Sequence, residues 1–322
     1  MRRLVLSMLC AALAVGFPVA SYAQAYPSKP IRFIVPFAPG GGNDILGRVI
    51  AVKLHESFGV SVVVDNRGGA GGTIGTDILA KSPPDGYTVL INNVSLAVNV
   101  TLYPKLPYDT LKDLEPVSLV GRQPNILVVH PSLPAKTVKD LIALARAKPG
   151  QLTYGSGGIG SSSHLSAELL KLIAKVDLVH VPYKGMGPAL VDLVAGQTQL
   201  CMATMASALP HVKSGRIRAL AVSTAQRVSV VPDVPTMIEA GIRDFDYSTW
   251  YGIVVPAGTP QPVIARLHGE LVKVLATQDV KEKFNAQGVD PASTTPQEFR
   301  AYLKSEVDKW AKVVKASGMK VN

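Results

Sequence analysis

The chain has 322 residues, of which 47% are hydrophobic and 17% are charged, and its formal net charge is +10. This length and composition are typical of a globular protein with a large core, built as two domains or as one large one. The basic residues are scattered and no basic stripe is interleaved with aromatic side chains, so nucleic-acid binding is not predicted. The six histidines show no metal-ligand spacing, and no metal or cofactor is predicted.

Residues 1–25 have the layout of a secretory signal peptide. Arg2 and Arg3 form a short positive region, residues 4–19 are largely apolar, and small residues near Ala25 offer cleavage sites. The apolar run is too short for a membrane-spanning helix. We therefore expect a soluble exported protein that keeps Cys201 as its one cysteine, packed in the core.

The segment 31–44 predicts a buried strand, a glycine loop and a helix start. Residues 31–37 are an almost continuous apolar run, residues 40–42 are glycines, and Asn43 and Asp44 are good helix N-caps. Such a loop binds anions well, because bare backbone and the unpaired N–H groups of the helix start point at the ligand. A tight turn with a capped helix is the alternative. We expect Asp44 to cap its own helix, with contact to a ligand amine or a bridging water as the second possibility.

The middle of the chain predicts a crossing between two domains. The apolar runs 117–120 and 126–129 are broken by Gly121 and Pro124, and we expect the chain to enter a second domain there. The apolar segment 250–255 is a strand that returns to the first domain. Two α/β domains joined by at least two crossings imply a hinge and a cleft.

Strands and helices alternate regularly after Thr137. The strands are expected at residues 151–154, 178–181, 200–203 and 217–223. This βαβαβ pattern predicts a parallel sheet with right-handed crossovers. In the first domain, residues 93–95 follow the strand 87–92, at the end of the sheet where open α/β folds bind ligands.

Residues 155–164 form a second glycine loop, and Gly155, Gly157 and Gly160 match the dinucleotide-binding fingerprint. The fingerprint also needs an acidic residue at the end of the next strand, where this chain has Val181-Pro182-Tyr183, so a nicotinamide cofactor is not expected. No Walker lysine and no G-x-S-x-G elbow are present. Two interpretations stay open: an anion pocket of glycine amides and serine hydroxyls, or a serine-capped helix after a turn. His164 is expected to be a packing or hydrogen-bonding residue.

Motifs throughout the chain resemble the extracytoplasmic solute-binding receptors of the tripartite tricarboxylate transporter family, the Bug or TctC-like proteins. The motifs are VPFAPGGGND at 35–44, PDGYT at 84–88, GSGGIGS at 155–161, VPYKG at 181–185, LPH at 209–211, RALAV at 218–222, WYG at 250–252 and PAGTP at 256–260. The resemblance implies an α/β, two-lobed periplasmic-binding-protein fold of type II, with a ligand cleft between the lobes and no catalysis. We expect lobe 1 at residues 26–123 plus 249–322, and lobe 2 at residues 124–248.

The resemblance also implies a ligand site between the lobes. Carried onto this sequence, its residues are Phe37, Ala38, Gly41, Gly42, Asn43, Asp44, Ser95, Ser156, Gly157, Gly160, Ser161, Ser162, Tyr183, Gly185 and Thr204. This chain departs from the family pattern at Ala203-Thr204, where relatives often have Asp, and at Gln199, where an acid is common. Residues 92–96 are also richer in amides than usual. The first departure makes an amino-acid ligand less favoured here.

The sequence therefore predicts a monomeric periplasmic receptor for a small carboxylate. The receptor would deliver its ligand to the membrane subunits of a tripartite tricarboxylate transporter, or as an orphan to a sensor protein. An exported α/β enzyme is the remaining alternative, and the sequence offers it no nucleophile–base pair.

Overall fold

The computed structural model describes residues 26–317, 319 and 320, so the predicted signal peptide lies outside the described residues. The strands are β1 (Ile31–Val35), β2 (Val62–Asn66), β3 (Thr88–Asn93), β4 (Leu114–Val129), β5 (Thr153–Ser156), β6 (Val179–Pro182), β7 (Leu200–Thr204), β8 (Arg218–Val222), β9 (Ser248–Pro256) and β10 (Asp290–Pro291). The helices are α1 (Gly42–Phe58), the short η1 (Ala70–Gly72), α2 (Thr73–Ala80), α3 (Ser95–Leu102), α4 (Val138–Ala147), α5 (Ser162–Ala174), α6 (Met186–Val194), α7 (Met205–Lys213), α8 (Gln261–Ala276), α9 (Gln278–Asn285) and α10 (Pro296–Ser317).

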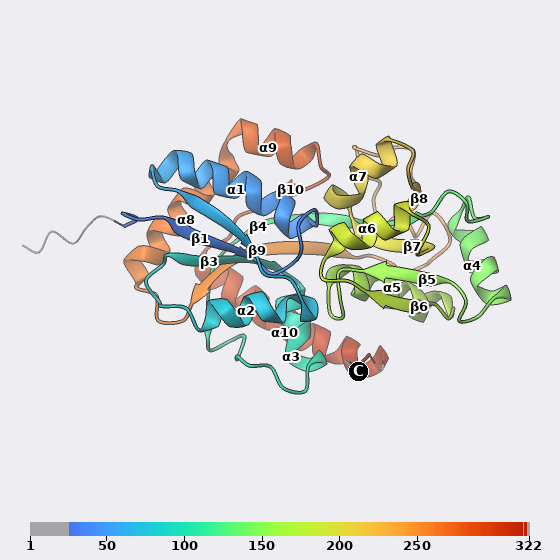
Figure 1. Ribbon diagram of the computed structural model, residues 1–322, viewed down its shortest axis with the longest axis horizontal. Helices are drawn as coiled ribbons and strands as arrows, with labels where there is room; N and C mark the ends of the chain where they lie inside the picture. The colour runs from blue at the N-terminus through green and yellow to red at the C-terminus, as the bar shows by residue number, and fades with distance from the viewer. Residues whose placement is uncertain (1–25, 318, 321–322) are drawn as a thin grey trace, which may run out of the picture.

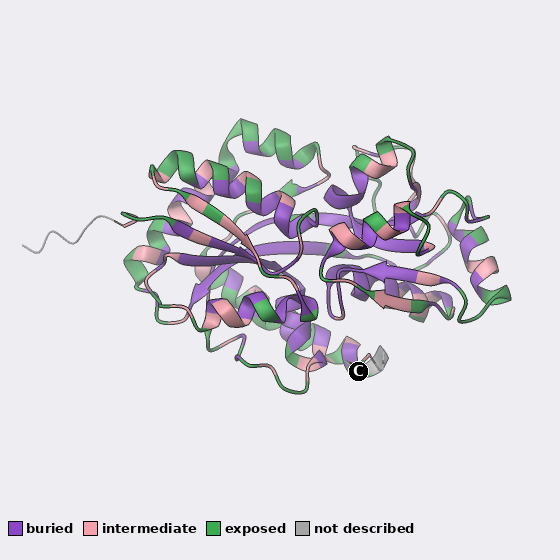
Figure 2. Cartoon of the chain, viewed as in Figure 1, coloured by how far each residue is buried: buried purple, intermediate pink, exposed green. Residues whose placement is uncertain are grey.

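Two lobes share one sheet whose centre is the antiparallel pair β4 and β9 (Figure 1). The strand order is β2-β1-β3-β9-β4-β7-β5-β6, with β10 and β8 also paired to β4. Strands β1 to β3 form one end of the sheet and strands β5 to β7 form the other. The central strands are buried almost throughout, whereas the outer helices expose one face (Figure 2).

Lobe 1 is built from alternating apolar side chains on the parallel strands β1, β2 and β3. Phe33 and Val35 of β1 pack with Leu46 and Ile50 of α1, whereas Ile34 belongs to the core on the opposite face of the sheet. This alternation is the two-residue period of a strand, and it explains why a nearly continuous apolar run is buried on both faces.

Strand β4 runs without interruption from Leu114 to Val129, so Gly121 and Pro124, which were expected to break the two apolar runs, lie within one strand. The ladder with β9 ends at Pro124, and from Asn125 onward β4 pairs with β7 and β8. Proline is tolerated there because its missing N–H falls where one ladder ends and the next begins. The partner change lies beside the predicted lobe boundary, but the division at 123/124 and 248/249 stays a prediction.

Lobe 2 contains parallel pairs between β5 and β6 and between β5 and β7. Each lobe is expected to have a mostly parallel sheet, and in lobe 2 the strand β8 is an exception because it pairs antiparallel with β4. Because β4 enters from lobe 1 between β7 and β8, these two strands do not pair with each other. The sheet of lobe 2 therefore combines a parallel part with the antiparallel strand that it shares with lobe 1.

Candidate ligand site between the lobes

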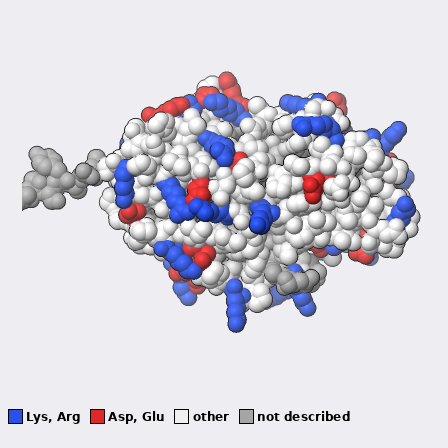
Figure 3. Space-filling view, in the orientation of Figure 1, with Lys and Arg blue, Asp and Glu red and all other residues white. Residues whose placement is uncertain are grey.

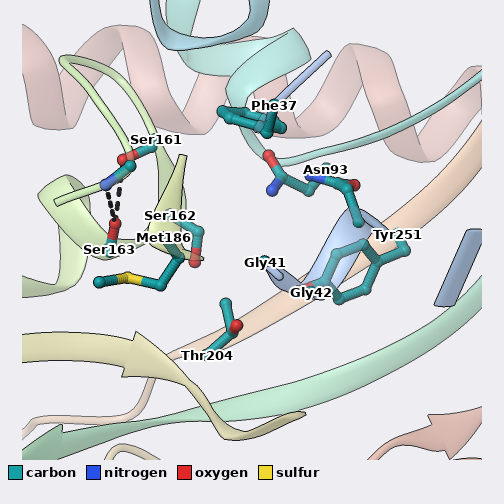
Figure 4. Close-up of a pocket in the computed structure, with 12 residues that line it drawn as sticks. Phe37, Gly41, Gly42, Asn93, Ser161, Ser162, Ser163, Met186, Thr204 and Tyr251 are labelled. Carbon is teal, nitrogen blue, oxygen red and sulfur yellow. Dashed lines mark hydrogen bonds between the residues drawn. The ribbon is translucent and has the colours of Figure 1, made fainter. Parts of the chain in front are cut away.

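A cavity of about 310 Å³, counting the part open to solvent, lies between the lobes. It is lined by Phe37, Gly41, Gly42, Asn43, Asn93, Gly157, Ser161, Ser162, Ser163, Met186, Thr204 and Tyr251. Figure 4 shows Phe37, Asn93 and Tyr251 from lobe 1 and its central strands, across the open space from the serines, Met186 and Thr204. Among the described residues that line the cavity, none has a charged side chain.

Four of the described helices begin at this cavity. The lining includes the N-cap and first two residues of α1, the N-cap and first two residues of α5, the first residue of α6 and the N-cap of α7. The first N–H groups of a helix have no partner within it, and the helix dipole places partial positive charge at the same end. Helix N-termini that converge in this way favour a bound anion.

The loop of lobe 1 is fixed by Asp44. Helix α1 begins at Gly42 with Gly41 as its N-cap, so the expectation that Asn43 or Asp44 is the N-cap was wrong. One carboxylate oxygen of Asp44 accepts a hydrogen bond from the Gly40 N–H at 3.0 Å, and the other accepts from Arg48 Nε at 3.0 Å and from Asn66 Nδ2 at 2.9 Å. Asp44 does not line the cavity.

The pKa of Asp44 reflects these partners. Burial would raise the pKa, but the hydrogen bonds from Arg48, Gly40 and Asn66, together with the Arg48 charge, lower it below its ordinary value. The carboxylate therefore stays ionised, and its negative charge is balanced by Arg48, which like Asp44 does not line the cavity.

The loop of lobe 2 uses its glycine N–H groups internally. The N–H of Gly157 donates to Ser163 Oγ at 2.8 Å, and the N–H of Gly160 donates to His164 Nδ1 at 3.2 Å. The Gly158 N–H donates to Ser156 Oγ at 3.1 Å. The expectation that these glycine amides point at a ligand was therefore wrong, because side chains of the same loop satisfy them. The His164 N–H donates to Ser161 Oγ, and the Ser162 hydroxyl bonds Asn125 and Thr249. The donors that remain are the first N–H groups of α5 and one hydroxyl of the bonded pair Ser161 and Ser163.

Two stacked histidines support this loop from behind. The rings of His164 and His180 lie 4.3 Å apart, and His180 Nε2 is 2.6 Å from Ser156 Oγ. Burial is the main reason that the pKa of His164 falls to about 4. Burial, followed by repulsion from His164 and Lys171, lowers the pKa of His180 to about 3. Both rings are neutral at pH 7, and neither lines the cavity.

The structure places just over half of the predicted site residues in the lining of the cavity. These are Phe37, Gly41, Gly42, Asn43, Gly157, Ser161, Ser162 and Thr204. The others lie outside it: Ala38, Asp44, Ser95, Ser156, Gly160, Tyr183 and Gly185. Direct ligand contact by any of them stays a prediction.

Several of the residues outside the lining hold the lobes together or support the loops. The Ala38 N–H donates to Lys184 O of the other lobe at 2.9 Å. A Cβ built on Gly185 would lie 2.7 Å from the Ala38 nitrogen, so glycine is needed for this close approach. Tyr183 turns its hydroxyl to Asp192 Oδ2 at 2.6 Å, and Ser95 donates to Asn92 Oδ1 at 2.9 Å. These residues shape and close the cleft.

The expected site residues did not include Asn93, Ser163, Met186 or Tyr251. Asn93 and Ser163 lie within the segments 93–95 and 155–164 that the sequence singled out, but they were not named individually. Tyr251 looked like core because it lies in an apolar strand. The available signal was a polar face on the two crossing strands: Gln123 and Asn125 alternate on β4, as Thr249 and Tyr251 do on β9, and all four are buried.

The rest of the surface carries charges of both signs, and Figure 3 shows basic and acidic side chains close together on one face. In residues 26–317, 319 and 320, no group of histidine, cysteine, aspartate and glutamate side chains is arranged to hold a metal ion. Within that same part of the chain, every helix is too short or too polar to cross a bilayer.

The fold and the site between the lobes define a periplasmic solute-binding protein, a class of receptor and not of enzyme. The family model described as the tripartite tricarboxylate transporter family receptor matches residues 46–319, so this chain belongs to that family. Protein BugT of Bordetella pertussis is 41% identical to it over 98% of this chain and 97% of BugT.

Solved structures of relatives share the fold. The periplasmic binding protein BugD matches with a TM-score of 0.89 and 33% identity, over 92% of this chain and 99% of that chain. Rpa4515 of R. palustris, solved with adipate, matches with a TM-score of 0.88 and 37% identity, over 91% of this chain and 98% of that chain. MatC of Rhodopseudomonas palustris, solved with bound malate, matches with a TM-score of 0.85 and 32% identity, over 90% of this chain and 100% of that chain.

Proposed function

We propose that this protein captures a small carboxylate in the periplasm, between its two lobes, and delivers it to the membrane subunits of a tripartite tricarboxylate transporter. The observation that carries the proposal is the convergence of the N-termini of α1, α5, α6 and α7 on one cavity without a charged lining residue. The adipate and malate bound by two relatives support the same ligand class.

Neutral donors are sufficient for useful affinity. A hydrogen bond to a charged group contributes roughly 1.5–3 kcal/mol, and a helix N-terminus adds about 0.3–1 kcal/mol. Four or five such contacts, less the free energy of ordering and desolvation, reach the roughly 8 kcal/mol of a micromolar complex. No arginine or lysine is needed in the site.

The site favours acids without an amine. An ammonium group in a buried site needs a carboxylate partner. Asp44 is the carboxylate closest in the sequence to the lining residues Gly41 to Asn43, but it already accepts hydrogen bonds from Arg48, Asn66 and Gly40. Thr204 stands in the lining where the resemblance led us to expect Asp in relatives. Gln199, the second departure, bonds Thr153 and does not line the cavity.

The contacts between the lobes connect capture to closure. Ala38 bonds Lys184 on one side of the cavity, and Tyr103 donates to Ile159 O at 3.2 Å on another. A ligand that fills the cavity would join the helix N-termini of both lobes and so favour this closed arrangement over an open one. Closure then distinguishes a loaded receptor from an empty one at the membrane.

The proposal is tested by a thermal-shift screen of the purified protein against organic acids, amino acids, amides and nucleotides. A ligand at one hundred times its Kd adds about 2.7 kcal/mol to the free energy of unfolding, which is a clear rise in Tm. We expect the rise with one class of carboxylates. A response to nucleotides or amino acids but not to acids would contradict the proposal.

A further inference from the structure

The floor of the cavity contains a buried hydrogen-bond chain that begins on helix α7 and ends at the ligand space. Its members are Ala206, Gln123 and Tyr251, and Gln123 and Tyr251 lie on the two strands that cross between the lobes. A Cβ built on Gly42 would overlap Tyr251 Oη and lie 2.7 Å from Gln123 Nε2. The chain therefore ends beside the first residue of α1, at the helix N-terminus.

The orientation of the Gln123 amide is fixed by the backbone. The N–H of Ala206 donates to Gln123 Oε1 at 2.9 Å, and a backbone N–H cannot act as an acceptor. The oxygen must therefore face Ala206, and the NH₂ group faces Tyr251 Oη, to which it donates. Gln123 and Tyr251 are 1% and 0% exposed, so water does not compete for these groups.

Tyr251 consequently accepts from Gln123 and has its own proton left to donate. The hydroxyl of Thr204 also lies beside Gly42, but it does not compete with Tyr251 as a donor to the ligand. Ser207 donates to Thr204 O at 2.8 Å, so its hydroxyl oxygen accepts from Thr204 Oγ1, also at 2.8 Å. The proton of Thr204 is thus used, and only its lone pairs face the cavity. Burial raises the pKa of Tyr251, which keeps the hydroxyl protonated.

We propose that Tyr251 is a ligand-binding residue that donates a hydrogen bond to a carboxylate oxygen of the captured acid, and that Gln123 is its positioning residue. This inference rests on the proposed function. A charged oxygen is a better acceptor than Thr204, so it takes the proton when it enters the cavity. Because Tyr251 is held as a donor, the N–H of an ammonium or amide group at the same position would face the Tyr251 O–H. Two donors would then oppose each other, and such a ligand is rejected.

The test compares adipate and malate binding by calorimetry in the native protein, Tyr251→Phe, Gln123→Met and the double variant. Loss of one hydrogen bond to a charged group predicts an affinity about ten- to a hundredfold weaker in Tyr251→Phe. Gln123→Met weakens binding less, because the hydroxyl remains but is no longer oriented. The double variant should bind as Tyr251→Phe does, since without the hydroxyl Gln123 has nothing to position.

Tyr154→Phe is the matched control. Tyr154 is equally buried, but it does not line the cavity, and its hydroxyl donates to Glu168 Oε1 at a distance of 2.6 Å. We expect the Tyr154→Phe variant to bind both acids with unchanged affinity. Unchanged affinity in Tyr251→Phe, or losses that multiply in the double variant, would overturn the inference while the proposed function stands. Should Tyr251→Phe fail to fold, unchanged affinity in Gln123→Met overturns it. If the native protein binds neither these acids nor other carboxylates, the proposed function falls, and this inference with it.

Discussion

The loops at residues 37–44 and 155–164 each lead from a strand to a helix N-terminus at the cavity, yet they are held in different ways. The first is fixed by a carboxylate, Asp44, which bonds backbone, arginine and amide partners. The second is fixed by neutral groups, because serine hydroxyls and His164 accept from its glycine N–H groups. The comparison shows that two helix starts at one cavity have opposite kinds of support, a carboxylate that does not line the cavity in one loop and neutral side chains in the other.

The two kinds of support should differ most in their response to acid. His164 has a folded pKa of about 4, well below its ordinary value, so the unfolded chain takes up a proton first as the pH falls below about 6.5. Stability from this residue is complete above pH 6.5 and declines by about 3 kcal/mol towards pH 4. His180, with a folded pKa of about 3, acts in the same direction.

Urea unfolding at a series of pH values between 7.5 and 4 measures this loss. His164→Asn is the matched variant, because its Oδ1 occupies the place of Nδ1 and can still accept from the Gly160 N–H but does not titrate. The stability of this variant should fall less steeply with pH. Equal slopes in both proteins would show that the histidine stack does not control the acid response.

The glycines of the two loops should differ in their tolerance of a methyl group. Gly42→Ala places a Cβ against the bonded side chains of Tyr251, Gln123 and Thr204, so we expect carboxylate affinity to fall by a hundredfold or more, about 2.7 kcal/mol. At Gly157 the nearest atoms lie 3.4–3.5 Å from a Cβ, which is ordinary contact, and Gly157→Ala should keep its affinity within about threefold. Calorimetry of the pair decides the point, and similar losses in both would contradict it.

Removal of the charge at residue 44 should have a moderate effect on stability. Asp44→Asn keeps the shape but loses the charged acceptor for Arg48 and Asn66, so the free energy of unfolding should fall by about 1–2 kcal/mol at pH 7. Since the folded pKa of Asp44 is lowered, its contribution is present above the ordinary pKa and lost as the pH falls through the folded value. A difference that persists in strong acid would count against the ionic role.

The smallest effect is expected at Arg48. Its side chain is half exposed and pairs with Asp44 at 2.9 Å, and exposed ion pairs contribute about 0–1 kcal/mol. Arg48→Ala should therefore cost at most about 1 kcal/mol, because Gly40 and Asn66 still hold the carboxylate. Chemical denaturation at low and high salt measures it. A loss larger than that of Asp44→Asn would assign the support to the arginine.

Local patterns predicted the elements around the site better than they predicted hydrogen bonds. Apolar runs followed by glycine and serine located both loops, because strand burial and helix starts depend on nearby residues. The use of the Gly157 and Gly160 N–H groups depends on Ser163 and His164 being turned towards them, which spacing alone does not show.

Long-range pairing accounts for the other differences. Pro124 looked like a break because its missing N–H was judged without the two ladders that meet there. Tyr251 looked like core because the role of its hydroxyl depends on Gln123, 128 residues away in the sequence. The antiparallel position of β8 likewise depends on where β4 enters lobe 2.

The most direct test of an anion site made of helix N-termini is calorimetry of the native protein with adipate and with adipamide, its neutral diamide of nearly the same shape. Adipamide lacks the negative charge that the helix N-termini favour. Its N–H groups would also face the N–H and O–H donors of the site, where the carboxylate oxygens of adipate accept. We predict that the acid binds at least a hundredfold more tightly than the amide. Equal binding of the two, or tighter binding of the amide, would contradict the account.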